Sequence, residues 1–324
     1  MTLGRAAWRP ESPWDEVFAA DVREGLLATP RHLPSRYFYD DLGSALFEAI
    51  CRLPWYRITR SELALLARHA RDVLAPLGPP ASLVELGCGS GEKMAVLASG
   101  TGRPSTQIQL VDVSRAALDM ASHRLHSAGH TAVLTHQCPY EEGLVRAARH
   151  RPREGTLAVV FLGSNLGNFD RPGARALLRR IRDALRPGDA LVLGTDLVKP
   201  EAELLLAYDD PLGVTAAFNL NLLRRIDDEL GGTFVLDGFA HRAMWNAEEH
   251  RVEMHLVSRR EQRVRVPAAG LDLVIGEGES IRTETSYKYE PDTILAEGTR
   301  AGFARGTQWI DPEARFALTR FDVV

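Results

Sequence analysis

The chain has 324 residues, of which 45% are hydrophobic and 25% are charged. These proportions are typical of a soluble globular protein and exclude a collagen, a coiled-coil rod or a disordered tail, and the length suffices for one large core or for two domains. The 39 Lys and Arg residues against 43 Asp and Glu residues give a net charge of −4, so no positive field exists to hold a polyanion and we expect no nucleic-acid partner.

Cysteine usage and hydropathy predict a cytoplasmic protein. Cys51, Cys88 and Cys138 are far apart and form no paired motif, which is typical of a reducing compartment. Residues 1–10 contain no apolar signal segment, and apolar runs such as residues 157–162 are far shorter than the roughly 18 to 20 residues of a membrane span. We also expect no metal, because His, Cys and carboxylate residues do not cluster with ligand spacing.

The first 70 residues predict helices with aromatic clusters between them. Apolar residues recur near a period of 3.6 from residue 10 to about residue 70, as in amphipathic helices. Residues 37–43 interrupt this period with three aromatics before a turn, and residues 53–56 place two more beside Pro54. Such clusters either fill a core or line a site.

The middle of the chain alternates short strands with helices. This alternation indicates a parallel sheet that is covered by helices on both faces. We expect one helix at residues 115–126 after the N-cap Ser114, and another at residues 171–185. The expected strands cover residues 82–86, 108–113, 132–135, 157–162 and 190–194.

A different pattern begins near Lys199 and indicates a second domain. Its strand-like alternations are compatible with a small antiparallel unit. We therefore predict an α/β fold in which residues 1–60 plus 199–287 form a substrate-binding domain, and residues 61–198 plus 288–324 form the cofactor-binding domain. The elements expected after Lys199 are helices through residues 204–206, 219–230 and 291–301, and strands at residues 251–259, 262–266, 280–289 and 316–323.

The most specific local motif is a glycine-rich loop at residues 84–93, directly after the first predicted strand. Gly87, Gly89 and Gly91 let the backbone turn sharply and approach a ligand. The sixth position is Glu92, where a dinucleotide-binding fingerprint has its third glycine. The spacing instead matches the E/D-x-G-x-G-x-G loop of S-adenosylmethionine (SAM) methyltransferases, whose glycines accommodate the amino-acid end of the cofactor.

An acidic residue strengthens this cofactor hypothesis. Asp112 ends the second predicted strand, 25 residues after Gly87, where a carboxylate can accept hydrogen bonds from both ribose hydroxyls. A glycine-rich turn without a ligand is the alternative. Cys88 lies inside the loop without a suitable histidine nearby, and we interpret it as a small filling residue, not as a nucleophile.

Six further motifs lie at residues 37–44, 53–56, 161–168, 207–210, 213–219 and 283–286. With them, the sequence closely resembles the histidine Nα-methyltransferase family of ergothioneine biosynthesis over nearly the whole chain. The resemblance implies a Rossmann-like class I methyltransferase sheet with an inserted α+β substrate-binding domain. It also implies that SAM methylates the α-amine of histidine three times, which gives the betaine hercynine.

The resemblance also implies two sets of site residues. Without the resemblance, a glutamate on an alternating strand is more typical of a solvated face, and an asparagine after a glycine is more typical of a turn. The cofactor set is Tyr56, Gly87, Gly89, Lys93, Asp112, Pro139 and Tyr140. The substrate set comprises Asn168 and Tyr208 for the amine and carboxylate, Tyr39 for a further hydroxyl there, Glu284 and Ser286 for the imidazole, and Thr285, Met254 and Tyr56 beside them. A carboxylate and a hydroxyl can satisfy imidazole nitrogens, whose unpaired burial costs about 1 to 3 kcal/mol each.

One position departs from the family pattern. The family has an acid followed by an aromatic at the site that recognises the adenine amino group, whereas this sequence has Cys138-Pro139-Tyr140. Tyr140 keeps a stacking surface, but Pro139 offers neither a side-chain acceptor nor a backbone donor. Either cofactor affinity is reduced, or Glu141 or Glu142 supplies the acceptor.

The expected reaction is an in-line displacement in which the neutral α-amine attacks the sulfonium methyl. Orientation of the reactants then contributes up to roughly 7 to 11 kcal/mol. Tyr39, or a water beside Asn168, is the candidate for taking the amine proton. His136 and His255 lie in strand-like alternations, and we interpret both as structural.

Two other functions stay open on the sequence alone. The protein could be an N-methyltransferase of the same fold that acts on a tryptophan-like or other amino acid, although Glu284 and Met254 do not suit a larger apolar pocket. It could also be a non-catalytic amino-acid-binding module, against which the intact loop and Asp112 argue. In each case we expect a small-molecule ligand and a monomer.

Overall fold

The structure is a computed structural model that describes residues 13–78, 81–100, 102, 106–304 and 306–324. Residues 1–12, where we expect no export signal, lie outside the described residues. The contacts divide the chain into two compact units. The boundary at Ile50 assigns residues 51–60 to the unit that holds the large sheet, while the sequence grouped them with the other domain. Unit 1 is formed by Met1–Ile50, Glu201–Asn246 and Val252–Thr285, and unit 2 by Cys51–Pro200, Ala247–Arg251 and Ser286–Val324.

Unit 2 contains a seven-stranded sheet with the strand order β11-β12-β5-β4-β1-β2-β3. Strands β1 to β5 are parallel, whereas β12 pairs antiparallel with β5 and β11 antiparallel with β12. The order 3-2-1-4-5 is that of a Rossmann-like sheet, which confirms the predicted fold class. The strands are β1 (Ala81–Leu86), β2 (Gln107–Asp112), β3 (Val133–Gln137), β4 (Thr156–Phe161), β5 (Ala190–Asp196), β11 (Thr307–Asp311) and β12 (Phe316–Asp322).

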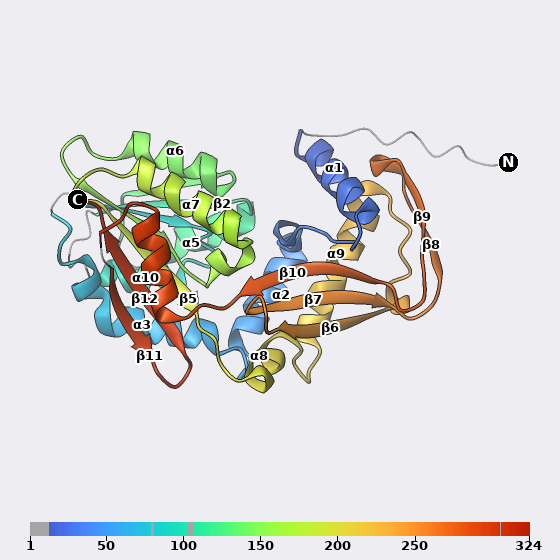
Figure 1. Ribbon diagram of the computed structural model, residues 1–324. Helices are drawn as coiled ribbons and strands as arrows, with labels where there is room; N and C mark the ends of the chain where they lie inside the picture. The colour runs from blue at the N-terminus through green and yellow to red at the C-terminus, as the bar shows by residue number, and fades with distance from the viewer. Residues whose placement is uncertain (1–12, 79–80, 101, 103–105, 305) are drawn as a thin grey trace. The chain divides into compact units, whose positions relative to one another are not determined.

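Helices of unit 2 pack against this sheet (Figure 1). Side chains of α6, α7 and α10, among them Leu144, Leu178 and Ile294, share one buried apolar cluster with β1, β4 and β5. Ser114 caps α5 by accepting a hydrogen bond from the backbone of Ala117, as the sequence predicted. The helices are α3 (Arg57–Leu74), α4 (Glu92–Ser99), α5 (Arg115–Ser127), α6 (Tyr140–His150), α7 (Arg171–Ala184) and α10 (Pro291–Arg300).

Unit 1 combines helices with two small sheets. The predicted strands at 251–259 and 262–266 belong to different sheets, because β7 lies between β10 and β6 while β8 pairs antiparallel with β9. Phe218, Leu222 and Ile226 form the buried face of α9. The elements are α1 (Pro13–Leu27), α2 (Asp41–Arg52), α8 (Glu201–Tyr208), α9 (Val214–Leu230), β6 (Phe239–Asn246), β7 (Arg251–Ser258), β8 (Gln262–Val266), β9 (Leu271–Ile275) and β10 (Ser280–Tyr287), with short 3-10 helices η1 (Ser35–Phe38), η3 (Leu236–Gly238) and η4 (Pro267–Ala269). Among the described residues, no helix is both long and apolar enough to span a membrane.

Candidate active site

The glycine-rich loop joins β1 to α4 in unit 2, and its glycines have different roles. Gly89 and Gly91 have φ values of +48° and +71°, which side chains disfavour. A Cβ at Gly91 would lie 2.7 Å from the Cβ of Ala121, so this glycine permits packing against α5. A Cβ at Gly89 would meet no described heavy atom within 4 Å. The backbone at Gly89 therefore borders open space, as a ligand-binding loop requires.

Asp112, at the end of β2, organises the same loop. Its Oδ2 accepts a hydrogen bond from the backbone N–H of Gly89 at 3.2 Å, and its Oδ1 accepts one from Ser114 at 2.9 Å. Burial raises the pKa of the Asp112 carboxyl group, while these backbone N–H groups act in the opposite direction. The residue that the sequence predicts as the ribose acceptor thus also fixes the loop backbone.

Glu85 is a buried carboxyl group beneath the loop. Its Oε2 has no hydrogen-bond partner among the described residues, and the residue is only 1% exposed. Burial raises the pKa of Glu85 to about 8; the nearby Lys93 ammonium opposes this shift, and Glu62 and Asp112 add to it. A buried acceptor without a partner is costly, and an ammonium group would satisfy it. The orphaned oxygen and the open space at Gly89 therefore fit the amino-acid end of SAM.

A buried ion pair lies beside the loop. Lys93 Nζ is 2.7 Å from Glu62 Oε2, and the Glu62 side chain is fully buried. Both carboxylate oxygens also accept the backbone N–H of Gly163, at 3.0 and 2.8 Å. A Cβ at Gly194 would lie 1.7 Å from Glu62 Oε1, so only glycine fits there. Lys93, predicted as a cofactor ligand, is thus fixed by a glutamate that the sequence did not single out.

The segment after β4 carries Asn168 on a short 3-10 helix, η2 (Asn165–Asn168). The turn before it is left-handed at both Gly163 (φ +74°) and Ser164 (φ +58°). Asn165 Nδ2 would lie 3.1 Å from a Cβ on Gly87, so η2 begins against the glycine-rich loop. Sequence reasoning missed this contact of Asn165 with the loop, although Asn165 belongs to the same motif as Asn168.

The unusual Pro139 is the N-cap residue of α6. The ring of the following Tyr140 packs edge-on against Phe161, with centroids 5.3 Å apart and an interplanar angle of 74°. Its hydroxyl oxygen would lie 3.0 Å from a Cβ on Gly87. Tyr140 therefore supports the loop, in addition to its predicted stacking role.

The two glutamates that could replace the missing acid each form an ion pair with an arginine. Glu141 accepts a hydrogen bond from Arg180 at 3.2 Å, and Glu142 accepts one from Arg146 at 2.5 Å. Both pairs are solvent-exposed, so each is worth little energetically. Neither carboxylate is held in place for an adenine amino group by these contacts.

Pro139→Asp is expected to tighten binding of S-adenosylhomocysteine by about 1 kcal/mol, roughly fivefold, because it supplies the acceptor that the family has at this position. Calorimetric titration measures the change. Pro139→Asn is the matched control, because aspartate and asparagine both cap a helix well but only the carboxylate adds a charge-assisted acceptor. Equal affinity of the Asp variant and the parent protein would mean that another residue already serves the adenine.

The predicted substrate residues are divided between the two units. In unit 1, the ring of Tyr39 packs edge-on against Phe47 and Phe218, with centroids 5.6 and 5.9 Å away. The backbone carbonyl of Tyr208 accepts a hydrogen bond from His241 Nε2 at 2.8 Å. Unit 1 also holds the buried Met254 on β7 and the half-buried Glu284 and Thr285 on β10, and unit 2 holds the buried Tyr56, the buried Ser286 and the half-buried Asn168.

The two strand histidines have structural hydrogen bonds. His136 Nε2 lies 2.9 Å from Gln109 Oε1, and His255 Nε2 lies 3.0 Å from Glu253 Oε2. Burial lowers the pKa of both imidazoles. Within the described part of the chain, no group of three or more His, Cys, Asp or Glu residues is arranged to hold a metal ion.

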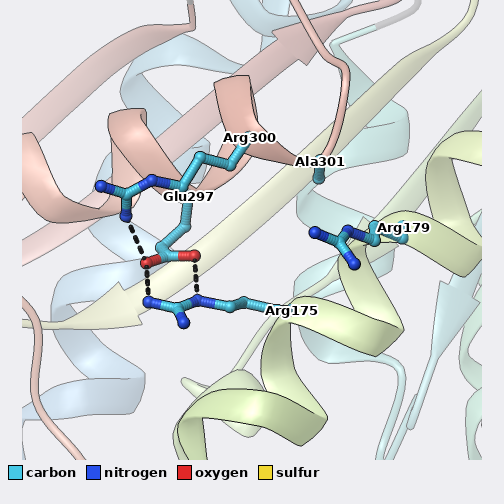
Figure 2. Close-up of a pocket in the computed structure, with 5 residues that line it drawn as sticks. All are labelled: Arg175, Arg179, Glu297, Arg300 and Ala301. Atoms are coloured by element: carbon cyan, nitrogen blue, oxygen red, sulfur yellow. Dashed lines mark hydrogen bonds and ion pairs between the residues drawn. The ribbon is translucent and has the colours of Figure 1, made fainter.

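A surface pocket of unit 2 lies apart from these residues (Figure 2). Glu297 of α10 accepts two hydrogen bonds from Arg175 of α7, at 2.8 and 2.9 Å, and a third from Arg300 at 2.9 Å. Arg179 and Ala301 complete the lining. The ion pairs join α7 to α10, so we interpret this pocket as structural.

The Rossmann-like sheet, the glycine-rich loop after β1 and the acid at the end of β2 define a cofactor site of the kind found in SAM-dependent methyltransferases. A family model described as histidine-specific, SAM-dependent methyltransferase matches residues 18–323. The chain belongs to this family, and it is an enzyme that uses SAM, as the sequence predicted.

Several named relatives agree with this assignment. The chain is 39% identical over 322 residues to the histidine N-alpha-methyltransferase of Mycolicibacterium smegmatis, covering 98% of this chain and 99% of the relative. It is 40% identical over 303 residues to that of Mycobacterium tuberculosis, covering 92% of each. Ergothioneine biosynthesis protein 1 of Neurospora crassa is 26% identical over 285 residues, which are 86% of this chain and 32% of that protein. Histidine methylation in ergothioneine biosynthesis is therefore the function that the relatives support.

Proposed function

We propose that the protein methylates the α-amine of L-histidine three times with SAM and releases hercynine, the first step of ergothioneine biosynthesis. The match of a histidine-specific family model to residues 18–323 carries this proposal. The orphaned Glu85 oxygen and the open loop at Gly89 support the cofactor half of it. The presence of Glu284 and Ser286 at the positions expected to read an imidazole supports the substrate half.

In the proposed mechanism, SAM when bound supplies an electrophilic methyl group on a sulfonium. The glycine-rich loop and Asp112 hold the cofactor, and Glu85 accepts a hydrogen bond from its ammonium group. Asn168 and Tyr208 orient the amine and carboxylate of the substrate. Tyr39, or a water beside Asn168, takes the amine proton, because an ammonium cannot act as a nucleophile. The protein thus contributes mainly orientation and exclusion of water.

Glu284 and Ser286 are proposed to recognise the substrate ring. They are two residues apart on β10, so their side chains leave the same face of that strand. A carboxylate accepts the ring N–H, and a hydroxyl can pair with the other ring nitrogen. A tryptophan-like substrate lacks the second ring nitrogen and would leave one of these groups unpaired.

Glu284→Ala is expected to lower kcat/KM for histidine at least about tenfold, which corresponds to ~1.4 kcal/mol of transition-state stabilisation. The affinity for S-adenosylhomocysteine should stay near that of the parent protein, because Glu284 is not proposed to contact the cofactor. Steady-state kinetics and calorimetry measure the two quantities. Glu277→Ala, at an exposed glutamate of the same unit, is the matched control and should leave both unchanged.

Unchanged histidine turnover in a folded Glu284→Ala variant would show that Glu284 is a solvated strand residue. Loss of both histidine turnover and cofactor affinity would indicate misfolding, which a thermal melt detects independently.

Mass spectrometry of the reaction products tests the proposed function as a whole. Purified protein with SAM and histidine should give mono-, di- and trimethylated histidine in succession. Methylation of tryptophan or tyrosine without any methylation of histidine would overturn the substrate assignment. Cofactor binding without any transfer would favour the amino-acid-binding module.

We further propose that the enzyme works in the cytoplasm as a monomer. Cys88 and Cys138 are buried free thiols, and burial raises the pKa of both, which keeps them in the inert thiol form. Free thiols of this kind suit a reducing compartment. Size-exclusion chromatography with light scattering measures the oligomeric state, for which we expect the mass of one chain.

A further inference from the structure

Ser286 is hydrogen-bonded to a buried ion-pair network that the proposed mechanism does not use. Lys288 Nζ donates a hydrogen bond to Ser286 Oγ at 2.9 Å and lies 3.0 Å from Asp196 Oδ2. Lys199 Nζ lies 2.6 Å from the other oxygen, Asp196 Oδ1. The side chain of Lys288 is 0% exposed and that of Asp196 is 2% exposed. Two lysines therefore share one carboxylate in the interior of unit 2.

Asp196 anchors this network to the large sheet. It is the last residue of β5, and its backbone N–H donates a hydrogen bond to Ser164 Oγ at 3.0 Å, just before η2. Its backbone carbonyl accepts the N–H of Tyr289 at 3.1 Å. The same residue thus fixes the side chain of Lys288 and the turn that leads to Asn168. A network attached to the rigid end of the sheet can hold a hydroxyl in one orientation.

The direction of the Lys288 to Ser286 hydrogen bond determines what Ser286 offers to a ligand. An ammonium group has three donors and no acceptor, so the Ser286 oxygen accepts and its single hydrogen points away from Lys288. Hydrogen bonds in series polarise one another, so a charged donor behind the hydroxyl strengthens its donation. The ammonium also disfavours a second positive charge near Ser286.

We propose that Lys288, held by Asp196, is a positioning residue that makes Ser286 donate a hydrogen bond to an unprotonated ring nitrogen, so that the enzyme selects histidine with a neutral imidazole. This inference rests on the proposed function, since it assumes that Ser286 contacts the substrate ring. It assigns part of the substrate specificity to a residue that acts on the ring through the Ser286 hydroxyl.

The first test compares two buried lysines. Lys288→Met removes the donor to Ser286 but leaves Asp196 paired with Lys199. We expect the KM for histidine to rise at least tenfold with a smaller change in kcat and an unchanged affinity for S-adenosylhomocysteine. Lys199→Met removes the other partner of Asp196 and should change the KM less than threefold. Lys288→Gln, whose amide can still donate to Ser286, should retain much of the parent affinity for histidine.

A double-mutant cycle separates positioning from a general structural effect. In a Ser286→Ala background, Lys288→Met should raise the KM less than twofold, because the hydroxyl through which it acts is gone. An equal rise in both backgrounds would overturn the inference.

The second test needs no variant at Lys288, so it tests the selection of a neutral imidazole even if Lys288→Met does not fold. The ring of the analogue 1,2,4-triazole-3-alanine keeps an acceptor nitrogen and an N–H group. Unlike imidazole, this ring stays uncharged between about pH 5.5 and pH 7.5. The ratio of the KM for histidine to the KM for this analogue should rise about tenfold per pH unit below the imidazole pKa of about 6.5. Any change in the protonation of the enzyme affects both assays and cancels in the ratio.

A ratio that stays constant from pH 7.5 to about pH 5.5 would overturn the inference. If wild-type protein methylates neither compound, the proposed function fails. If it methylates histidine but the ratio stays constant and the cycle shows no coupling, this inference fails and the proposed function stands.

Discussion

Glu85→Gln is expected to stabilise the cofactor-free protein at pH 8 and to remove part of its pH dependence. The pKa of Glu85 is raised from 4.5 to about 8, first of all by burial. The folded state therefore retains a proton that the unfolded state releases above about pH 4.5, so the free energy of unfolding falls as the pH rises to about 8 and levels off above. A shift of this size corresponds to an effect on the order of a few kcal/mol. Urea denaturation at several pH values measures it.

Cofactor binding should displace the proton that the folded, cofactor-free protein keeps on Glu85. If Glu85 pairs with the ammonium group of the cofactor, binding of S-adenosylhomocysteine at pH 7 releases up to about one proton, which makes the calorimetric enthalpy depend on the buffer. Glu85→Gln should abolish that dependence. Glu297→Gln is the control, because arginines lower the pKa of Glu297 and move its titration away from neutral pH. A parent protein without buffer dependence would contradict the assignment of Glu85.

Asp112→Asn is expected to weaken S-adenosylhomocysteine binding by about 1 to 3 kcal/mol, roughly 5- to 150-fold. An amide keeps one acceptor oxygen but loses the charge that strengthens bonds to ribose hydroxyls. In the parent protein, the two carboxylate oxygens of Asp112 accept hydrogen bonds from the backbone N–H groups of Gly89 and Ser114. The amide has one acceptor oxygen and cannot keep both of these bonds. Calorimetric titration measures the loss.

The control for this variant is Asp119→Asn, at an exposed carboxylate of α5 that pairs with its helix neighbour Arg115. It should leave the affinity unchanged. If Asp112→Asn binds the cofactor as well as the parent protein does, the carboxylate neither contacts the ribose nor stabilises the loop.

The parallel sheet could be predicted because its central strands are short apolar runs. Five of the six residues of β4 are buried, and all seven of β5 are, so the strands are recognisable without alternation. The edge strand β11 has only exposed and half-buried residues, and β6 has a single buried one. Such strands owe their conformation to pairing with a neighbour, and the sequence analysis did not identify either of them.

The site was predictable where its residues are neighbours in sequence. The glycine-rich loop and Asp112 follow consecutive strands of one local pattern. Glu62 could not be assigned, because its partner Gly163 is 101 residues away. Lys288 likewise depends on a carboxylate at the end of β5. Buried charges of this kind are recognised only when the fold places opposite charges together.

The antiparallel pairing of β5 with β12 has a consequence for biosynthesis. β5 is complete at Asp196, but its partner begins at Phe316, about 120 residues later, which takes roughly 10 s at usual rates of translation. During that interval the nascent chain presents an apolar strand with one unpaired edge, a template for aggregation. Protection of this edge by a chaperone or by early local folding is therefore a condition for efficient expression of the enzyme.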